Sequence, residues 1–254
     1  MPSSRFTLPT PDRLIPRPAA GRLRALCGHA YAHRGLHGNG RSENGLPAAR
    51  AAIEAGFGIE CDVRAASGAE AMVVHDAELT RLTGHARTVS ALSPDEVKLS
   101  RLRDGSTIPT LPELLADVAG RVPVLVEVKT AREFNPVLCE SVAAAVSESR
   151  GAIGVMSFDP RVGAWFAENA PDVPRGLVAS NDGRRGPRTT LRHLAAIRLA
   201  RPDFLAWDIR DLPDPVPAAA RRRGLCVFTW TVRTADERAR ARANADGPIF
   251  EEGQ

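Results

Sequence analysis

Short apolar runs alternate along the chain with segments of helical periodicity, and this alternation limits the possible folds more than any other feature. It is typical of βα units arranged around a parallel sheet. From residue 28 onward we predict eight strands, at residues 30–33, 58–63, 71–75, 122–128, 153–157, 176–179, 204–207 and 225–230.

The segments between these strands have the start signals of helices. Asp159 places a capping carboxylate before Pro160, and Thr110 and Thr234 can accept hydrogen bonds from the amides that follow them. The predicted helices are residues 45–55, 111–119, 133–150, 160–169, 187–199, 215–223 and 234–243.

A chain of 254 residues with eight strands and interleaved helices favours an α/β fold of the (β/α)8 TIM-barrel type. An open doubly wound sheet is less consistent, because no G-x-G-x-x-G turn follows the first strand. Residues 78–108 do not fit the repeat, so we expect a small insertion after the third strand, with a short helix at 94–99 started by Ser93. We expect residues 28–254 to form this single domain and the proline-rich residues 1–27 to form an extended arm.

Charge and composition exclude several classes of protein. The 34 Lys and Arg residues and 30 Asp and Glu residues are scattered, so we expect neither a nucleic-acid partner nor a stable membrane anchor. No apolar stretch is long enough for a signal-peptide core or a membrane span, which favours a cytoplasmic protein. The four cysteines lack metal or redox spacing and are expected to be reduced, mostly buried thiols: Cys27, Cys61, Cys139 and Cys226. The oligomeric state is left open.

Acidic residues stand at the ends of two predicted strands, where barrel enzymes place their chemistry. Side chains alternate along a strand, so Glu60 and Asp62 face one side, as do Glu127 and Lys129. Cys61 should then face the helices, as should Val128. Three carboxylates in one cavity need a compensating charge, and a hard divalent cation bound by oxygen atoms supplies it. We predict Mg²⁺ or Ca²⁺, with Mn²⁺ also compatible; the competing interpretation is a buried salt-bridge network with Arg34 and Lys129.

Histidines and cations end the same strands. His33 and His75 would supply the pair of groups that a reaction needs when one proton is removed and another delivered near neutral pH. Arg34 and Lys129 suit a phosphate, since a guanidinium pairs with two oxygens and an ammonium adds a point charge. Trp230 either fills the barrel or lines the pocket. The remaining histidines are expected in loops or on the surface: His29, His37, His85 and His193.

The order of these motifs resembles that of the glycerophosphodiester phosphodiesterase family over about residues 28–250. Each string alone is weak, but five in order with the right separations are specific. They are Ala32-His33-Arg34-Gly35, Glu43-Asn44-Gly45, Glu60-Cys61-Asp62-Val63, Val74-His75-Asp76 and Glu127-Val128-Lys129, and they are followed by Ser157-Phe158, Trp230-Thr231-Val232 and Ala245-Asp246-Gly247.

The resemblance implies a TIM-barrel enzyme that hydrolyses glycerophosphodiesters to sn-glycerol 3-phosphate and an alcohol with one divalent cation. It implies metal ligation by Glu60, Asp62 and Glu127, and general acid–base catalysis by His33 and His75. It also implies phosphate binding by Arg34 and Lys129, with Glu43 as a further metal or glycerol contact. One histidine would deprotonate the glycerol 2-hydroxyl and the other would protonate the leaving alcohol, giving a cyclic phosphate that water then opens.

Two positions differ from the family pattern, and three alternatives stay open. Gly45 replaces the threonine of a Glu-Asn-Thr motif, and Gly247-Pro248-Ile249-Phe250-Glu251 replaces a Gly-Ile-Ile-Thr-Asp string. The first alternative is a lysophospholipase D-like enzyme acting on an acylated lipid. The others are a non-catalytic phosphodiester- or metal-binding barrel and an aldolase-type barrel using Lys129. An acylated substrate would need an apolar groove, to which Leu36, Phe57, Leu79, Phe158 and Trp165 are candidates to contribute.

Overall fold

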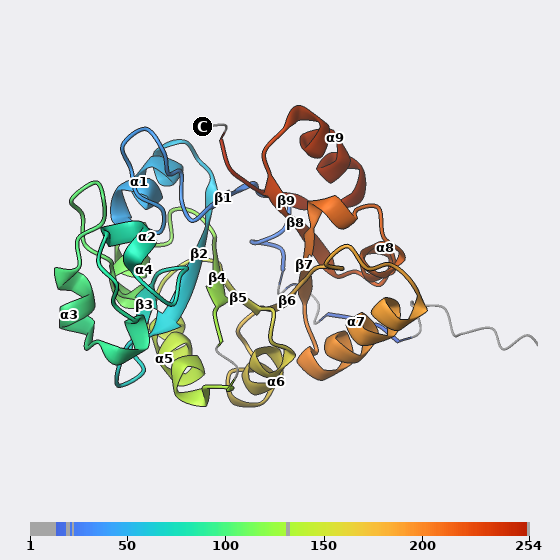
Figure 1. Cartoon of the computed structure of the whole chain (residues 1–254). Helices are drawn as coiled ribbons and strands as arrows, with labels where there is room; N and C mark the ends of the chain where they lie inside the picture. Colours follow the sequence, from blue (N-terminus) through green and yellow to red (C-terminus); the bar gives the residue numbers. More distant parts are fainter. Residues whose placement is uncertain (1–13, 19–20, 22, 131–132, 253–254) are drawn as a thin grey trace, which may run out of the picture.

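The computed structural model describes residues 14–18, 21, 23–130 and 133–252, which form a closed barrel of eight parallel strands surrounded by helices (Figure 1). The order around the barrel is β1-β2-β4-β5-β6-β7-β8-β9, and β9 pairs with β1 to close it. The barrel strands are β1 (Tyr31–His33), β2 (Gly58–Ala65), β4 (Val124–Val128), β5 (Ile153–Ser157), β6 (Arg175–Ala179), β7 (Phe204–Asp208), β8 (Cys226–Val232) and β9 (Gly247–Phe250).

Two strands differ from the sequence prediction, although the predicted fold class is confirmed. The run predicted at 71–75 forms β3 (Ala71–Val73), which pairs antiparallel with β2 and lies outside the barrel. The eighth barrel strand is instead β9, which we did not predict. The prediction went wrong because apolar composition does not reveal strand direction, and because Gly247 and Pro248 weaken the strand signal in a four-residue segment.

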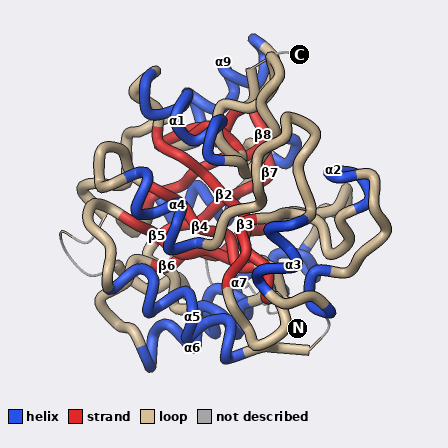
Figure 2. Tube along the Cα trace, turned by 90° about the vertical axis from the view of Figure 1, so that its left-hand side faces the viewer, coloured by secondary structure: helices blue, strands red, loops and turns tan. Residues whose placement is uncertain are grey.

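The helices lie outside the strands, as the tube view shows (Figure 2). The predicted caps are present: Asp159 accepts a hydrogen bond from the backbone N–H of Arg161, and Thr110 and Thr234 form capping boxes. The helices that follow barrel strands or β3 are α1 (Leu46–Glu54), α4 (Leu111–Val118), α5 (Pro136–Ser147), α6 (Pro160–Asn169), α7 (Pro187–Ala200), α8 (Pro215–Arg222) and α9 (Ala235–Asn244).

The expected insertion follows β3 and has its own small core. It contains α2 (Thr80–Thr83), the 3-10 helix η2 (Val89–Ala91) and α3 (Pro94–Leu99). Ser93 caps α3 in a capping box, as predicted. Apolar side chains of the insertion are buried against one another, among them Leu79, Leu82, Val89, Val97 and Ile108.

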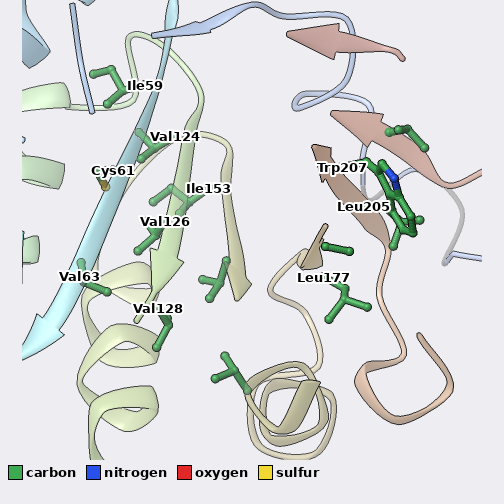
Figure 3. Packing of buried hydrophobic residues seen from close by; sticks show 14 of the residues in the cluster. Ile59, Cys61, Val63, Val124, Val126, Val128, Ile153, Leu177, Leu205 and Trp207 are labelled. Carbon is green, nitrogen blue, oxygen red and sulfur yellow. The ribbon is translucent and has the colours of Figure 1, made fainter. Parts of the chain in front are cut away.

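Two apolar layers hold the barrel together. The outer layer lies between strands and helices and includes Cys61 and Val128, as the alternation predicted; Figure 3 shows it along β2 and β4. The inner layer fills the barrel, where Tyr31, Phe204 and Phe228 pack edge to face. These aromatic side chains fill the inside of the barrel, which is therefore a packed core and not a channel.

Three sequence expectations need correction or restriction. Cys27 and Cys226 form a disulfide, so only Cys61 and Cys139 are free, buried thiols. His193, expected in a loop or on the surface, is a buried residue of α7 whose Nε2 lies 2.9 Å from Asn181 Oδ1. Most of the predicted arm at 1–27 lies outside the described residues, and the described part includes a hydrogen-bonded turn at 23–27.

None of the helices in the described ranges combines the length and apolar character that a membrane crossing requires. The cytoplasmic location and the boundaries at residues 27 and 28 are tested by no observation and stay predictions.

Candidate active site

Three buried carboxylates meet at the carboxyl ends of β2 and β4. Glu60 and Asp62 point to the same side of β2, and the register places Asp62 opposite Glu127 of β4. Their exposed fractions are 1%, 0% and 6%, respectively. One carboxylate oxygen from each lies within 4.8 Å of the other two. The alternation inferred from sequence therefore does bring these three residues together.

Two cations compensate part of this negative charge. Lys129 Nζ lies 3.0 Å from Asp62 Oδ1 and 2.5 Å from Glu127 Oε1. Arg34 Nε lies 3.2 Å from Asp62 Oδ2, and the backbone N–H of Arg34 donates to Glu60 Oε2 at 3.0 Å. Asn44 Nδ2 also donates to Asp62 Oδ2. Asp62 is thus the best-compensated acid of the three.

The acids differ in their pKa values for this reason. Burial raises the pKa of Glu60 well above its ordinary value, and the charges of Asp62 and Glu127 raise it further. Burial likewise raises the pKa of Glu127, to about 7, although Lys129 opposes the shift. Burial also acts on Asp62, but Lys129 and Arg34 outweigh it and hold its pKa at about 2. Without another cation, the cluster favours a proton on Glu60 or Glu127.

The donor set fits a hard divalent cation. Glu60 Oε1 is buried and has no hydrogen-bond partner among the described residues. Such orphaned buried oxygens are rare, because they lose hydration without replacement. The salt-bridge interpretation leaves this atom unexplained, since Arg34 and Lys129 pair with Asp62, Glu43 and Glu127. An all-carboxylate set suits Mg²⁺, Ca²⁺ or Mn²⁺.

Each of the two predicted catalytic histidines contacts a carboxylate through Nδ1. His33 Nδ1 lies 2.6 Å from Glu251 Oε1, and His75 Nδ1 lies 2.7 Å from Asp76 Oδ1. Burial lowers the pKa of both imidazoles, which favours their neutral forms near pH 7. A carboxylate accepts a proton donated by Nδ1, so Nε2 of each neutral ring is left as an acceptor.

A cavity of about 400 Å³ connects these groups. His33, His75 and Lys129 line it, and Trp230 forms part of its wall. The Trp230 indole N–H donates to the Ala206 carbonyl at 2.9 Å, which fixes the ring. The members of the predicted site that line this cavity are His33, Arg34, Glu60, His75, Glu127, Lys129 and Trp230.

Glu43 is held by two arginines, and its role as a metal or glycerol contact stays a prediction. It does not line this cavity; it bridges Arg34 and Arg81, with distances of 2.7 Å to each guanidinium. Arg81 Nε then pairs with Asp76 Oδ2 at 2.6 Å. Glu43 therefore belongs to a chain of ion pairs that runs from Arg34 through Arg81 and Asp76 to His75.

Sequence reasoning missed the partner of His33. Glu251 follows directly after β9 and its Oε2 also accepts from Arg233 Nε at 2.7 Å. A polar residue after an apolar strand was the signal that identified the other site residues. It was available here too, but the strand before Glu251 had not been recognised. Asp208, the last residue of β7, and Arg210, two residues later, also line the cavity and were not predicted.

Comparison with known proteins agrees with this architecture. Residues 33–250 match the Glycerophosphoryl diester phosphodiesterase family. A relative from Mycobacterium tuberculosis, "Probable glycerophosphodiester phosphodiesterase 2", is 33% identical over 108 residues, which span 42% of this chain and 40% of that protein.

Two solved structures illustrate the shared fold. A putative glycerophosphoryl diester phosphodiesterase from Silicibacter pomeroyi has a TM-score of 0.76 and 23% identity, covering 90% of this chain and 93% of the other. An Oleispira antarctica phosphodiesterase in complex with the product sn-glycerol-3-phosphate has a TM-score of 0.76 and 17% identity, covering 88% and 93%. The match over residues 33–250 spans most of the chain, and the chain therefore belongs to the glycerophosphoryl diester phosphodiesterase family of enzymes.

Proposed function

We propose that the chain hydrolyses glycerophosphodiesters to sn-glycerol 3-phosphate and an alcohol, with a divalent cation held by Glu60, Asp62 and Glu127. The observation that carries this proposal is the orphaned, buried oxygen of Glu60 within a cluster of three carboxylates that opens onto a cavity with two histidines. A bound cation would neutralise negative charge that develops on the phosphoryl oxygens.

The cationic side chains would bind the phosphate. Arg34 and Lys129 line the cavity and both carry their positive charge close to the carboxylates. The Lys129 ammonium also lies 5.9 Å from the centre of the ring of Phe158, which follows the neighbouring strand β5. A phosphodiester in the cavity would therefore meet fixed positive charge, as phosphoryl transfer requires.

The histidines would move the protons. With Nδ1–H donated to Glu251 or Asp76, each neutral imidazole presents Nε2 as an acceptor. One would take the proton of the glycerol 2-hydroxyl as its oxygen attacks phosphorus. The other, in its protonated form, would give a proton to the departing alcohol oxygen, and water would then open the cyclic phosphate.

Substitution of each histidine by alanine tests the assignment. Turnover should fall by about 10²- to 10⁴-fold for His33→Ala and for His75→Ala, whereas the affinity for Mg²⁺ measured by calorimetry should stay near the wild-type value. His85→Ala is the matched control, because His85 is exposed on the insertion. Undiminished turnover in both active-site variants would refute the acid–base roles.

A panel of substrates tests the reaction itself. Metal-free protein is incubated with glycerophosphodiesters of choline, ethanolamine, glycerol and inositol, with Mg²⁺, Ca²⁺, Mn²⁺ or no metal, and sn-glycerol 3-phosphate is measured. We expect release only with metal. Absence of release in folded protein that binds a divalent cation would contradict the proposal and favour the binding-barrel alternative.

The two other enzymatic alternatives receive less support. Of the candidate groove residues, Leu79 is buried and Phe158 alone among them is strongly exposed, at 48%, so these five residues do not together present a broad apolar surface to an acyl chain. A Schiff base needs a neutral lysine. Burial lowers the pKa of Lys129, but Glu127 and Asp62 outweigh it and raise the pKa above its ordinary value, which keeps the amine protonated.

A further inference from the structure

The loop after β1 brings a second histidine beside the catalytic His33. His37 Nε2 lies 3.9 Å from Glu251 Oε1, the same oxygen that lies 2.6 Å from His33 Nδ1. The three ligand atoms, one nitrogen from each histidine and one oxygen from Glu251, lie within 4.8 Å of one another. This group lies at the ends of β1 and β9, and His33 places it next to the carboxylate cluster of β2 and β4, with Nε2 3.9 Å from Glu60 Oε2.

The backbone fixes this arrangement before any ligand binds. Arg34 and Gly35 both have positive φ, at 57° and 76°, so the chain reverses directly after His33. A Cβ at Gly35 would lie 2.9 Å from the backbone of Ala48, and the N–H of Leu36 donates to the Ala48 carbonyl. The loop is therefore held tightly against α1, and His37 returns to within reach of Glu251.

The His37 side chain has no other evident role. It is only 14% exposed, yet its imidazole makes no hydrogen bond to any described residue. Its ring nitrogens are therefore available to a ligand. Glu251, by contrast, is oriented by Arg233 through Oε2, which leaves Oε1 directed at the two imidazoles.

We propose that His33, His37 and Glu251 form a second cation site, selective for zinc and similar transition metals, which inhibits the enzyme when filled. Two imidazoles and one carboxylate are a zinc-type donor set, and water would complete a tetrahedron. Mg²⁺ and Ca²⁺ prefer oxygen ligands, as in the carboxylate cluster. The two sites therefore differ in the metal that they select.

Zinc would inhibit the enzyme because His33 is both a ligand of the second site and a catalytic residue of the proposed function, on which this inference rests. A cation on Nδ1 takes the place of the proton donated to Glu251, so the proton of the neutral imidazole resides on Nε2. That nitrogen faces the cavity side, where it lies 3.9 Å from Glu60 Oε2. His33 would then have no free acceptor for the proton that the reaction must move.

Calorimetry tests zinc binding without any need for turnover. Metal-free protein is first saturated with Mg²⁺ and then titrated with Zn²⁺, and we expect one zinc ion per chain. Affinity should fall by about 100-fold or more in His37→Ala, since loss of a ligand costs at least as much as loss of a residue that supports one. Equal zinc affinity in wild type and His37→Ala would overturn the proposal.

Spectroscopy and kinetics complete the test. Co²⁺ should give the intense visible absorption of a tetrahedral site in wild type and in the control His85→Ala, and not in His37→Ala. Zinc should inhibit wild type even at high Mg²⁺, and His37→Ala should keep its Mg²⁺-dependent activity and resist zinc. Inhibition that excess Mg²⁺ relieves would place zinc at the carboxylates and refute the second site.

The outcomes separate this proposal from the proposed function. A protein that hydrolyses no diester but binds zinc through His37 retains the second site and loses the proposed function. A protein that hydrolyses diesters and whose zinc affinity does not depend on His37 retains the function and loses the second site.

Discussion

Two clusters of acidic residues lie at the same end of the barrel, and they differ in how their oxygens are satisfied. In the cluster of Glu60, Asp62 and Glu127, two buried oxygens have no hydrogen bond to a described residue, Glu60 Oε1 and Asp62 Oδ1, of which the second is 3.0 Å from the Lys129 ammonium. The second cluster consists of Asp208, Asp211 and Asp214, on the segment from β7 through the 3-10 helix η3 (Ile209–Asp211) to the start of α8. None of its buried side-chain oxygens lacks a hydrogen bond within the described residues.

The second cluster serves local structure. Asp208 accepts hydrogen bonds from the backbone N–H and the guanidinium of Arg210 and caps η3. Asp211 accepts from the backbone N–H of Asn181 at 2.6 Å, and Asp214 caps α8. Burial and negative charge are therefore common to both clusters. The presence of unsatisfied ligand atoms is what distinguishes a candidate metal site from a structural network.

The largest expected effect is that of Glu60→Gln. The amide keeps the size of the side chain and removes a charge and a ligand oxygen, so metal affinity should fall and kcat/KM should decrease by about 10³-fold, as expected when several kcal/mol of charge stabilisation is lost. Calorimetry and steady-state kinetics measure both. The folded state should be retained, because burying a neutral amide beside Asp62 costs less than burying a charge. Normal metal-dependent turnover in this variant would contradict the assignment.

Asp211→Asn should lower stability and leave activity unchanged, which is the reverse of the effect expected for Glu60→Gln. The neutral amide weakens the short hydrogen bond from the Asn181 backbone, and the free energy of unfolding should fall by about 1–3 kcal/mol. Asp211 does not line the cavity, so kcat/KM should stay near the wild-type value. Urea denaturation monitored by circular dichroism measures the stability change. Loss of activity in folded protein would show that Asp211 contributes to activity, as the acids of β2 and β4 are proposed to do, and that its role is not only structural.

The pH dependence of metal binding probes the first cluster alone. A metal must displace the proton from Glu127, whose pKa is raised to about 7, so affinity for Mg²⁺ should fall about tenfold for each pH unit below 7. In metal-free protein, the folded state retains this proton at pH values where the unfolded chain has lost it. The contribution of Glu127 to the free energy of unfolding should therefore decrease as pH rises from 5 to 8, whereas the lowered pKa values of His33 and His75 act in the opposite direction.

Glu127→Gln is the control for this behaviour. It removes one of the two carboxyl groups whose pKa is raised, so the free energy of unfolding of the metal-free variant should fall less between pH 5 and 8 than that of the wild type. Denaturant titrations at several pH values measure the difference. Identical pH profiles for the variant and the wild type would show that Glu127 does not carry the effect.

The comparison also shows what sequence can reveal about such a site. Alternation along a strand predicts that Glu60, Asp62 and Glu127 share a cavity, because the period of two is a property of every strand. Whether an acid is satisfied depends on residues distant in sequence: Asp211 and Asn181 are 30 positions apart. The sequence therefore identifies both sets of acids as candidates at most, and hydrogen bonding separates them.

The missed elements have equally specific physical causes. β9 was missed because Pro248 lacks an N–H and the strand has only four residues, and its omission hid Glu251. β3 was assigned to the barrel because an apolar run reads the same in either direction. The burial of His193 was predictable, since it shares a helical face with the buried Leu194, Ile197 and Ala200, but a histidine considered alone is expected at the surface.

The smallest expected effect is that of Arg210→Ala, and it sharpens the contrast within the second cluster. Arg210 is 76% exposed and pairs with Asp208, whose side chain is 2% exposed. Asp208 also accepts hydrogen bonds from the Arg210 backbone and from Ser180 Oγ, so loss of the guanidinium should lower the free energy of unfolding by less than about 1 kcal/mol.

Arg50→Ala provides the matched comparison, because Arg50 is 57% exposed and pairs with Asp117, whose side chain is 19% exposed and lies away from the cavity. If the two variants lose similar stability, the hydrogen bonds from the Arg210 backbone and Ser180 Oγ are enough to satisfy the Asp208 carboxylate, and the second cluster has a structural role. A much larger loss for Arg210→Ala would mean that Asp208 depends on a cation, like the acids of β2 and β4. Because Arg210 also lines the cavity, a change in KM without a change in kcat would show that it contributes to substrate binding and not to the chemical step.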